Sequence, residues 1–123
     1  IILARTTRYI SDSLNYDVLI LLPDESKKLY VASNYGKREK FDDHEMAVSN
    51  WVFEQGKNAG FGTDTLSSSQ WYHIPLKAQM GILGVMAIAP HNNMTNEQKH
   101  LIDAFANVVS LALSNSIYAT TEE

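Results

Sequence analysis

The sequence predicts an α+β domain in which helices gather against an antiparallel sheet. Three observations predict this class: the chain has 123 residues, its strand-like segments fall into two neighbouring pairs, and helical segments stand before, between and after those pairs. The expected order is therefore helix, two strands, helix, loop, two strands and helix. Residues 1–123 are expected to form a single domain, because this length suits one core and no internal repeat is visible.

The first half of the chain holds the opening helix and the first strand pair. Apolar residues recur at nearly helical spacing up to Asn15, which predicts an amphipathic helix. Tyr16 to Leu22 is rich in aliphatic residues and ends at Pro23, so it predicts a buried strand. The alternation from Lys28 to Asn34 predicts its antiparallel neighbour.

A helix and a loop are expected in the middle of the chain. Asp42 and Glu45 are spaced as a helix-start pair, and Gly56 is a stop signal, so a helix is expected between them that buries Trp51. The stretch from Asn58 to Gln70 contains glycines and many hydroxyl residues with little periodicity, which predicts a loop.

A second hairpin is expected from Trp71 to Leu76 and from Gly81 to Ala89. Pro75 cannot donate a hydrogen bond to a sheet ladder, so it is expected at a bulge or at a sheet edge. Thr95 and Gln98 form a capping box, which predicts that a final helix begins at Asn96 and continues to about Tyr118.

The final helix carries more apolar surface than one sheet face requires. Its apolar residues cover about half of the circumference, whereas an arc of about 100° is enough to cover a sheet. Either the helix is packed on two sides within the monomer, or it forms a dimer seam together with the first helix. The second interpretation predicts a symmetric parallel homodimer through five residues, namely Ile2, Ile10, Val109, Leu113 and Ile117.

Composition excludes several classes of function. The chain has no cysteine, so it has no disulfide, thiolate nucleophile, thiolate zinc site or thioether-linked chromophore. The net charge is -4 and the ten Lys and Arg residues are scattered, so nucleic acid is not an expected partner. The apolar runs are far shorter than the roughly 20 residues of a membrane span, so no direct membrane insertion is expected. The four histidines show no two-ligand spacing, and no metal site is expected.

The glycine loop is the first candidate ligand site. Gly60 and Gly62 let the main chain approach a ligand closely, while Thr63, Asp64 and Thr65 offer hydroxyl and carboxylate oxygens. Such a loop suits a small polar molecule or a cation such as potassium. The alternative is a surface loop that caps itself, with Asp64 bonded to neighbouring amides.

Three further residues are candidates for lining a pocket. Trp51 and Tyr72 offer aromatic walls, and His73 offers a hydrogen-bonding or pH-sensitive group. The alternatives are core packing for Trp51 and a surface or fully hydrogen-bonded position for His73.

Several segments resemble the GAF domain of the KdpD sensor histidine kinases, and the resemblance covers nearly the whole chain. The segments that carry it are Trp51 with Ala59-Gly60, Gly62-Thr63-Asp64-Thr65-Leu66, Tyr72 with Pro75-Leu76, Gly84-Val85-Met86 and the closing LIDAFANVVSLAL. The resemblance implies a GAF-like, PAS-related antiparallel sheet with the N- and C-terminal helices packed on one face.

The resemblance also implies a role. It implies a regulatory domain that belongs to a longer sensor kinase on the cytoplasmic side of a bacterial inner membrane, dimerises, and relays signals to the kinase core through its terminal helices. The parent would control a potassium-uptake operon through a response regulator and would use ATP and magnesium. This chain has no phosphoacceptor histidine box, no ATP-binding signature and no catalytic constellation, so no catalytic residue or cofactor is expected here. The alternative is a small-molecule or ion-binding GAF module of another signalling protein.

Overall fold

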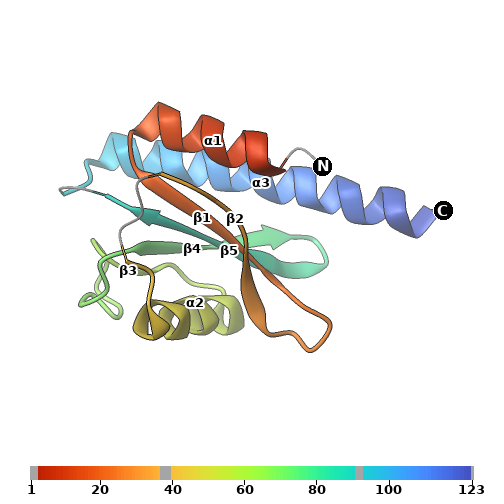
Figure 1. The fold of residues 1–123 in the computed structure, drawn as a ribbon, viewed down its shortest axis with the longest axis horizontal. Coiled ribbons are helices and arrows are strands. Elements are labelled where there is room, and N and C mark those ends of the chain that lie inside the picture. Colours follow the sequence, from red (N-terminus) through yellow and green to blue (C-terminus); the bar gives the residue numbers. More distant parts are fainter. Residues whose placement is uncertain (1–2, 37–39, 91–92, 123) are drawn as a thin grey trace.

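The computed structural model describes residues 3–36, 40–90 and 93–122. Their strands form one antiparallel sheet in the order β2-β1-β5-β4-β3. Helices α1 (Leu3–Leu14) and α3 (Asn96–Glu122) lie on one side of the sheet, and α2 (Asp43–Gln55) lies on the other (Figure 1). The strands are β1 (Asp17–Pro23), β2 (Leu29–Tyr35), β3 (Ala59–Gly60), β4 (Tyr72–Ala78) and β5 (Gly81–Ala89). The predicted α+β class, with both terminal helices on one face, is confirmed.

The signals that begin and end the helices act as the sequence predicts. The Asp42 carboxylate accepts a hydrogen bond from the Glu45 N–H at 3.1 Å, and Gly56 ends α2 in a left-handed conformation. At the start of α3, the Gln98 N–H donates to the Thr95 hydroxyl at 3.1 Å, and the Gln98 side chain accepts from the Thr95 N–H at 2.8 Å. None of the described helices is long and apolar enough to cross a lipid bilayer.

Strand β3 was not predicted, because it is a two-residue edge strand inside the expected loop. It pairs only with Tyr72 and His73 of β4. Pro75 lies beyond the end of β3, so its lack of an N–H breaks no ladder on that side. The predicted edge position of Pro75 is therefore confirmed. The hairpin turn is shorter than expected, because β4 continues to Ala78.

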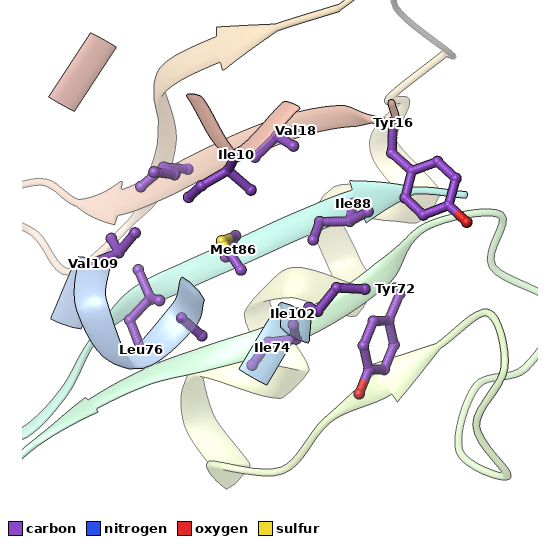
Figure 2. Close-up of a cluster of buried hydrophobic side chains, with 12 residues drawn as sticks. Ile10, Tyr16, Val18, Tyr72, Ile74, Leu76, Met86, Ile88, Ile102 and Val109 are labelled. Atoms are coloured by element: carbon purple, nitrogen blue, oxygen red, sulfur yellow. The ribbon is translucent and has the colours of Figure 1, made fainter. Parts of the chain in front are cut away.

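The larger core lies between the sheet and the terminal helices. Figure 2 shows Ile10 of α1 and Ile102 and Val109 of α3 gathered over side chains of β1, β4 and β5. Three of the five predicted dimer residues belong to this core: Ile10 is 1% exposed, Val109 is 0% exposed and Leu113 packs against them. The assignment of Ile10 and Val109 to a dimer seam is wrong, since both are buried in the core of their own chain. The assignment of Leu113, which is only partly buried, stays a prediction. Ile2 and the side chain of Ile117 lie outside the described residues.

A second core lies between α2 and the sheet. Its centre is Trp71, which is fully buried, meets the Phe41 ring edge-to-face at 5.2 Å, and donates its indole N–H to the Lys40 carbonyl at 3.0 Å. Trp51 is only partly buried and packs at the margin of this cluster. The expectation that α2 buries Trp51 is therefore only partly met, since Trp71 occupies the buried position.

Candidate functional site

The loop between β3 and β4 is bonded mainly to itself. The Gly60 N–H donates to the Thr65 carbonyl at 2.8 Å. The Thr63 hydroxyl lies 2.8 Å from the carbonyls of Gly60 and Thr65 and accepts the Thr65 N–H at 3.2 Å. These bonds fit the alternative of a surface loop that caps itself. The side chain that bonds to the neighbouring backbone is that of Thr63, however, and not that of Asp64, which is exposed. Ligand contact at Gly60, Gly62, Thr63, Asp64 and Thr65 stays a prediction.

The same loop is attached to the start of α3. The Lys99 ammonium donates a hydrogen bond to the Gly62 carbonyl at 3.0 Å. A Cβ at Gly62 would lie 3.0 Å from the Met94 methyl group, so this part of the loop packs closely against the segment before α3. A contact therefore runs from the loop to the C-terminal helix.

At its start the loop requires a glycine. Gly60 has a φ of 99°, a conformation that L residues rarely adopt, and a Cβ there would lie 2.2 Å from the Trp71 carbonyl. The close approach lets the Phe61 N–H donate to that carbonyl at 2.9 Å. Gly60 therefore fixes the loop against the beginning of β4.

A buried polar cluster joins α2, the loop and β4. The Glu45 carboxylate accepts from the Ser69 hydroxyl and, at 3.0 Å each, from His73 Nε2 and the Gln70 N–H. The other ring nitrogen of His73, Nδ1, lies 2.7 Å from the Ser49 hydroxyl. His73 and Ser49 are 0% exposed and Glu45 is 5% exposed. One carboxylate therefore connects α2 to the end of the loop and to the start of β4, which lie 24 to 28 residues further along the chain.

Two pKa shifts define the charge of this cluster. Burial alone would raise the pKa of Glu45, but hydrogen bonds from His73, Ser69 and Gln70 together outweigh it, so its pKa lies below the ordinary 4.5. Burial lowers the pKa of His73 below its ordinary 6.5, although Glu45 opposes the shift. At neutral pH the pair is therefore an ionised carboxylate and a neutral imidazole that donates from Nε2 and accepts from Ser49 at Nδ1.

Ser49, His73 and Glu45 are the residue types of a hydrolase triad, in which a serine is the nucleophile, a histidine is the base and a carboxylate orients the histidine. A hydrolase needs that serine at a surface that substrate can reach, whereas Ser49 is fully buried within α2. The cluster therefore acts as a structural tie in this conformation. Among the described residues, no group of three or more His, Asp or Glu side chains is arranged to hold a metal ion.

The predicted pocket residues do not meet at one place. His73 and Trp51 lie on the α2 side of the sheet, whereas Tyr72 lies in the opposite core with Ile74 and Ile102 (Figure 2). The hydroxyl of Tyr72 accepts a hydrogen bond from Asn58 at 2.8 Å. Grouping Tyr72 with Trp51 as walls of one pocket is wrong, because neighbouring side chains of a strand point to opposite faces.

Ser49 and Ser69 were not predicted as site residues, and Glu45 was predicted only as part of the helix start. A signal was present in α2, where Glu45, Val48, Ser49 and Val52 are all buried at helical spacing. A glutamate and a serine on a buried helical face require polar partners. His73 and Ser69 are those partners.

The outer face of α3 is a second candidate site. Leu101, Ala104, Val108 and Leu111 are all exposed and follow one another at intervals of three, four and three residues. This spacing places them in one stripe, on a different face of the helix from the one that carries Ile102 and Val109. Such a stripe on a surface helix is typical of a contact with another helix.

The N-terminal helix lies beside this stripe. The Tyr9 ring of α1 meets the Phe105 ring of α3 edge-to-face at 6.0 Å, and Tyr9 is itself exposed. The exposed apolar surface therefore extends from α3 onto α1.

Comparisons with known proteins agree with this architecture. Residues 2–115 match the GAF domain family. The chain is 30% identical to the sensor protein KdpD of Clostridium acetobutylicum and 30% identical to that of Escherichia coli, over 94% and 99% of its length. It spans only 14% of each of these relatives.

Solved structures give the same result. The crystal structure of the GAF domain of the potassium sensor histidine kinase KdpD from Escherichia coli superposes with a TM-score of 0.82 at 30% identity, covering 99% of this chain and 86% of that one. The second GAF domain of DevS from Mycobacterium smegmatis superposes with a TM-score of 0.75 at 14% identity, covering 99% and 97%, which shows the fold alone. The chain therefore belongs to the GAF domain family. Within that family it is a domain of the type found in the KdpD sensor proteins.

Proposed function

We propose that this domain regulates a longer KdpD-type sensor histidine kinase and relays its state to the kinase core through the terminal helices. The parent controls a potassium-uptake operon through a response regulator. The parent binds ATP and magnesium in its catalytic core, outside residues 1–123, and the domain itself lies on the cytoplasmic side of a bacterial inner membrane. The similarity to KdpD GAF domains over nearly the whole chain supports this assignment.

The domain itself acts as a relay without chemistry of its own. The inaccessible position of Ser49 and His73 supports this, because a nucleophile and its base require an opening to substrate. The terminal helices support it as well. Helices α1 and α3 lie side by side and run in opposite directions, so that the start of α1 and the end of α3 lie on the same side of the molecule in Figure 1. A shift of α3 would pass to whatever follows it in the parent.

The observation that carries the relay is the apolar stripe on the outer face of α3. Leu101, Ala104, Val108 and Leu111 have the three-and-four spacing by which two helices pack knobs into holes. The next position of the pattern is Asn115, which is also exposed. A single asparagine at such a position favours one register in a parallel helix pair. The domain therefore pairs with a second copy, helix α3 against helix α3.

A domain exchange tests the assignment. The GAF domain of the Escherichia coli KdpD is replaced by residues 1–123, and induction of the potassium-uptake operon is measured in high and low potassium at pH 7.5. Induction that still depends on potassium supports the proposal. A chimera that behaves like a kinase without any GAF domain, although it is present at the same level, contradicts it.

A matched pair of variants in the same chimera tests the relay. Leu111→Glu places a charge in the stripe, and Asn107→Glu places it on a neighbouring exposed position outside the stripe. Regulation lost with Leu111→Glu and retained with Asn107→Glu supports the α3 contact. Equal effects of the two variants would count against it.

A further inference from the structure

We propose that Glu45, Ser49, Ser69 and His73 form a proton-released latch, in which neutral His73 keeps the loop of residues 61–70 closed against α2 and uptake of a proton by His73 opens it. The latch goes beyond the relay proposed above. Only its effect on signalling rests on that proposed function.

The hydrogen bonds between the loop and α2 depend on one side chain. Ser69 and Gln70 are the loop residues whose hydrogen bonds to α2 are described, and both bonds end on the Glu45 carboxylate. The loop residues before them, 66–68, are exposed. Loss of the Glu45 contacts therefore removes the attachment of this end of the loop to α2, while the bonds of the Ser69 hydroxyl to the Trp71 backbone and the pairing of the sheet remain.

The position of His73 makes the cluster sensitive to a proton. Its ring is 0% exposed, so a positively charged imidazolium there would not be hydrated. Its Nδ1 accepts from the Ser49 hydroxyl at 2.7 Å, and protonation would turn that acceptor into a second donor, so the Ser49 hydroxyl would have to rotate and accept instead. The closed cluster is therefore built for the neutral ring.

The surroundings of His73 offer little compensation for a positive charge. From α2 it is faced by the Glu45 carboxylate and, at longer range, by His44, which opposes a second positive charge. Its neighbours in the sheet, Ala59 of β3 and Ala87 of β5, are uncharged, and the Phe41 ring lies 5.9 Å away. Among the described residues, Glu45 is thus the one anionic partner, and its carboxylate is shared with Ser69 and Gln70.

Proton binding and opening are therefore coupled. Burial lowers the pKa of His73 despite Glu45, whereas an open loop admits water and returns the pKa toward 6.5. Because the open state binds the proton more tightly, a fall in pH below 6.5 shifts the equilibrium toward it.

The open loop also affects α3. Gly62, in the same loop, accepts the hydrogen bond from Lys99 at 3.0 Å. A loop released at Ser69 no longer holds that contact in one position at the first turn of the helix. Proton uptake on the α2 side of the sheet is thereby coupled to the helix that we propose as the relay.

Amide hydrogen exchange of the 123-residue domain tests the latch. Protection factors, corrected for the intrinsic effect of pH, are measured by NMR for the Gln70 and Trp71 amides between pH 7.5 and 5.5. A single proton with an open-state pKa of 6.5 predicts a loss of protection of up to about tenfold at pH 5.5. Amides of the central strand β5 are expected to lose much less.

Two variants distinguish opening of the latch from a general loss of structure at low pH. His73→Gln lacks the titrating ring and is expected to show protection at Gln70 and Trp71 that is the same at both pH values. Ser69→Ala keeps His73 but removes the bond to Glu45 and also the acceptor of the Trp71 N–H, so only the Gln70 amide is informative in this variant. Its protection is expected to be lower than in the wild type at both pH values and to keep the pH dependence. This second variant keeps the proposal testable if His73→Gln does not fold.

Three results overturn the latch. The first is protection of the wild-type amides that does not change with pH. The second is a loss of protection on acidification that is as large in His73→Gln as in the wild type. The third is protection of the Gln70 amide in Ser69→Ala equal to that in the wild type. None of them affects the domain exchange, which is measured at constant pH and does not require the loop to open.

Discussion

Val108 and Val109 are consecutive residues of α3, yet Val108 is 58% exposed and Val109 is 0% exposed. Val109 packs on the sheet with Ile102, and Val108 lies in the outer stripe with Leu111. One helix therefore carries two apolar faces. The first closes the core of the monomer, and the second is exposed and is the face that we propose for contact with another copy of the chain.

Substitutions at the two valines are expected to have opposite effects. Val108→Lys should change the free energy of unfolding of the monomer by no more than about 0.5 kcal/mol, because it lies at the surface. It should weaken dimerisation at least about tenfold, since it places a charge in the stripe. Val109→Ala should cost about 1–3 kcal/mol of stability by leaving a cavity. Sedimentation equilibrium and urea unfolding measure these effects, and a Val108→Lys dimer as tight as the wild type would refute the assignment.

Glu45 is expected to contribute more to the free energy of unfolding than an ordinary surface glutamate. Glu45→Ala removes the acceptor for Ser69, His73 and the Gln70 N–H and leaves buried donors unpaired, so it should destabilise the domain by about 2–5 kcal/mol. Glu54, on the same helix but exposed, is the matched control. Glu54→Ala should stay within about 0.5 kcal/mol. Urea unfolding compares the two, and similar losses would show that the buried cluster contributes nothing special.

Stability should fall on acidification in two stages. The pKa of His73 is lowered by burial, so below pH 6.5 the unfolded chain binds a proton that the folded chain resists. The free energy of unfolding should therefore fall by up to about 1.4 kcal/mol per pH unit from pH 6.5 downward. The pKa of Glu45 is also lowered, so its contribution is present above pH 4.5 and is lost as the pH falls further.

The difference between two slopes isolates His73. Urea unfolding of the wild type and of His73→Gln is compared between pH 7.5 and 5.5, because the other histidines are common to both proteins. The wild type should lose more stability over this range. Parallel curves would mean that His73 is protonated equally well in the folded and unfolded chains.

Gly60→Ala should be destabilising for two reasons. The left-handed conformation disfavours alanine, and the new Cβ would lie 2.2 Å from the Trp71 carbonyl. Together these should cost about 2–4 kcal/mol. Gly81→Ala is the control for conformation alone, since Gly81 has a φ of 128° and nothing lies within 4 Å of its Cβ; it should cost about 1–2 kcal/mol. Equal losses in thermal or urea unfolding would show that the loop yields to the clash.

The local signals in the sequence were sufficient for most of the fold. Caps such as Asp42 and Thr95 act within one turn of a helix, and alternation defines a strand from its own residues, so both can be found without knowledge of the partners. The two-residue strand β3 could not be found in this way. Its pairing is decided by Tyr72 and His73, which lie across the loop.

The site was harder to predict because it depends on distant contacts. The periodicity of α3 correctly indicated surplus apolar surface, but it could not tell which of two adjacent stripes faces the sheet, and so Val109 was assigned to the wrong one. In the cluster of Glu45, Ser69 and His73, Ser69 and His73 lie 24 and 28 positions after Glu45. The polar residues on the apolar face of α2 indicate that polar partners are needed, but nothing within that segment identifies Ser69 and His73 as those partners.

Cysteine cross-linking tests the central claim most directly, because the chain has no cysteine of its own. Leu111→Cys places a thiol in the outer stripe of α3, and Asn107→Cys places one on the same helix outside it. In a parallel pair in register, the two copies of residue 111 face each other closely enough for a disulfide. Under mild oxidation, non-reducing electrophoresis should show a covalent dimer for Leu111→Cys and little for Asn107→Cys. A monomer for Leu111→Cys, at concentrations where the wild type sediments as a dimer, would contradict the pairing of α3 with α3.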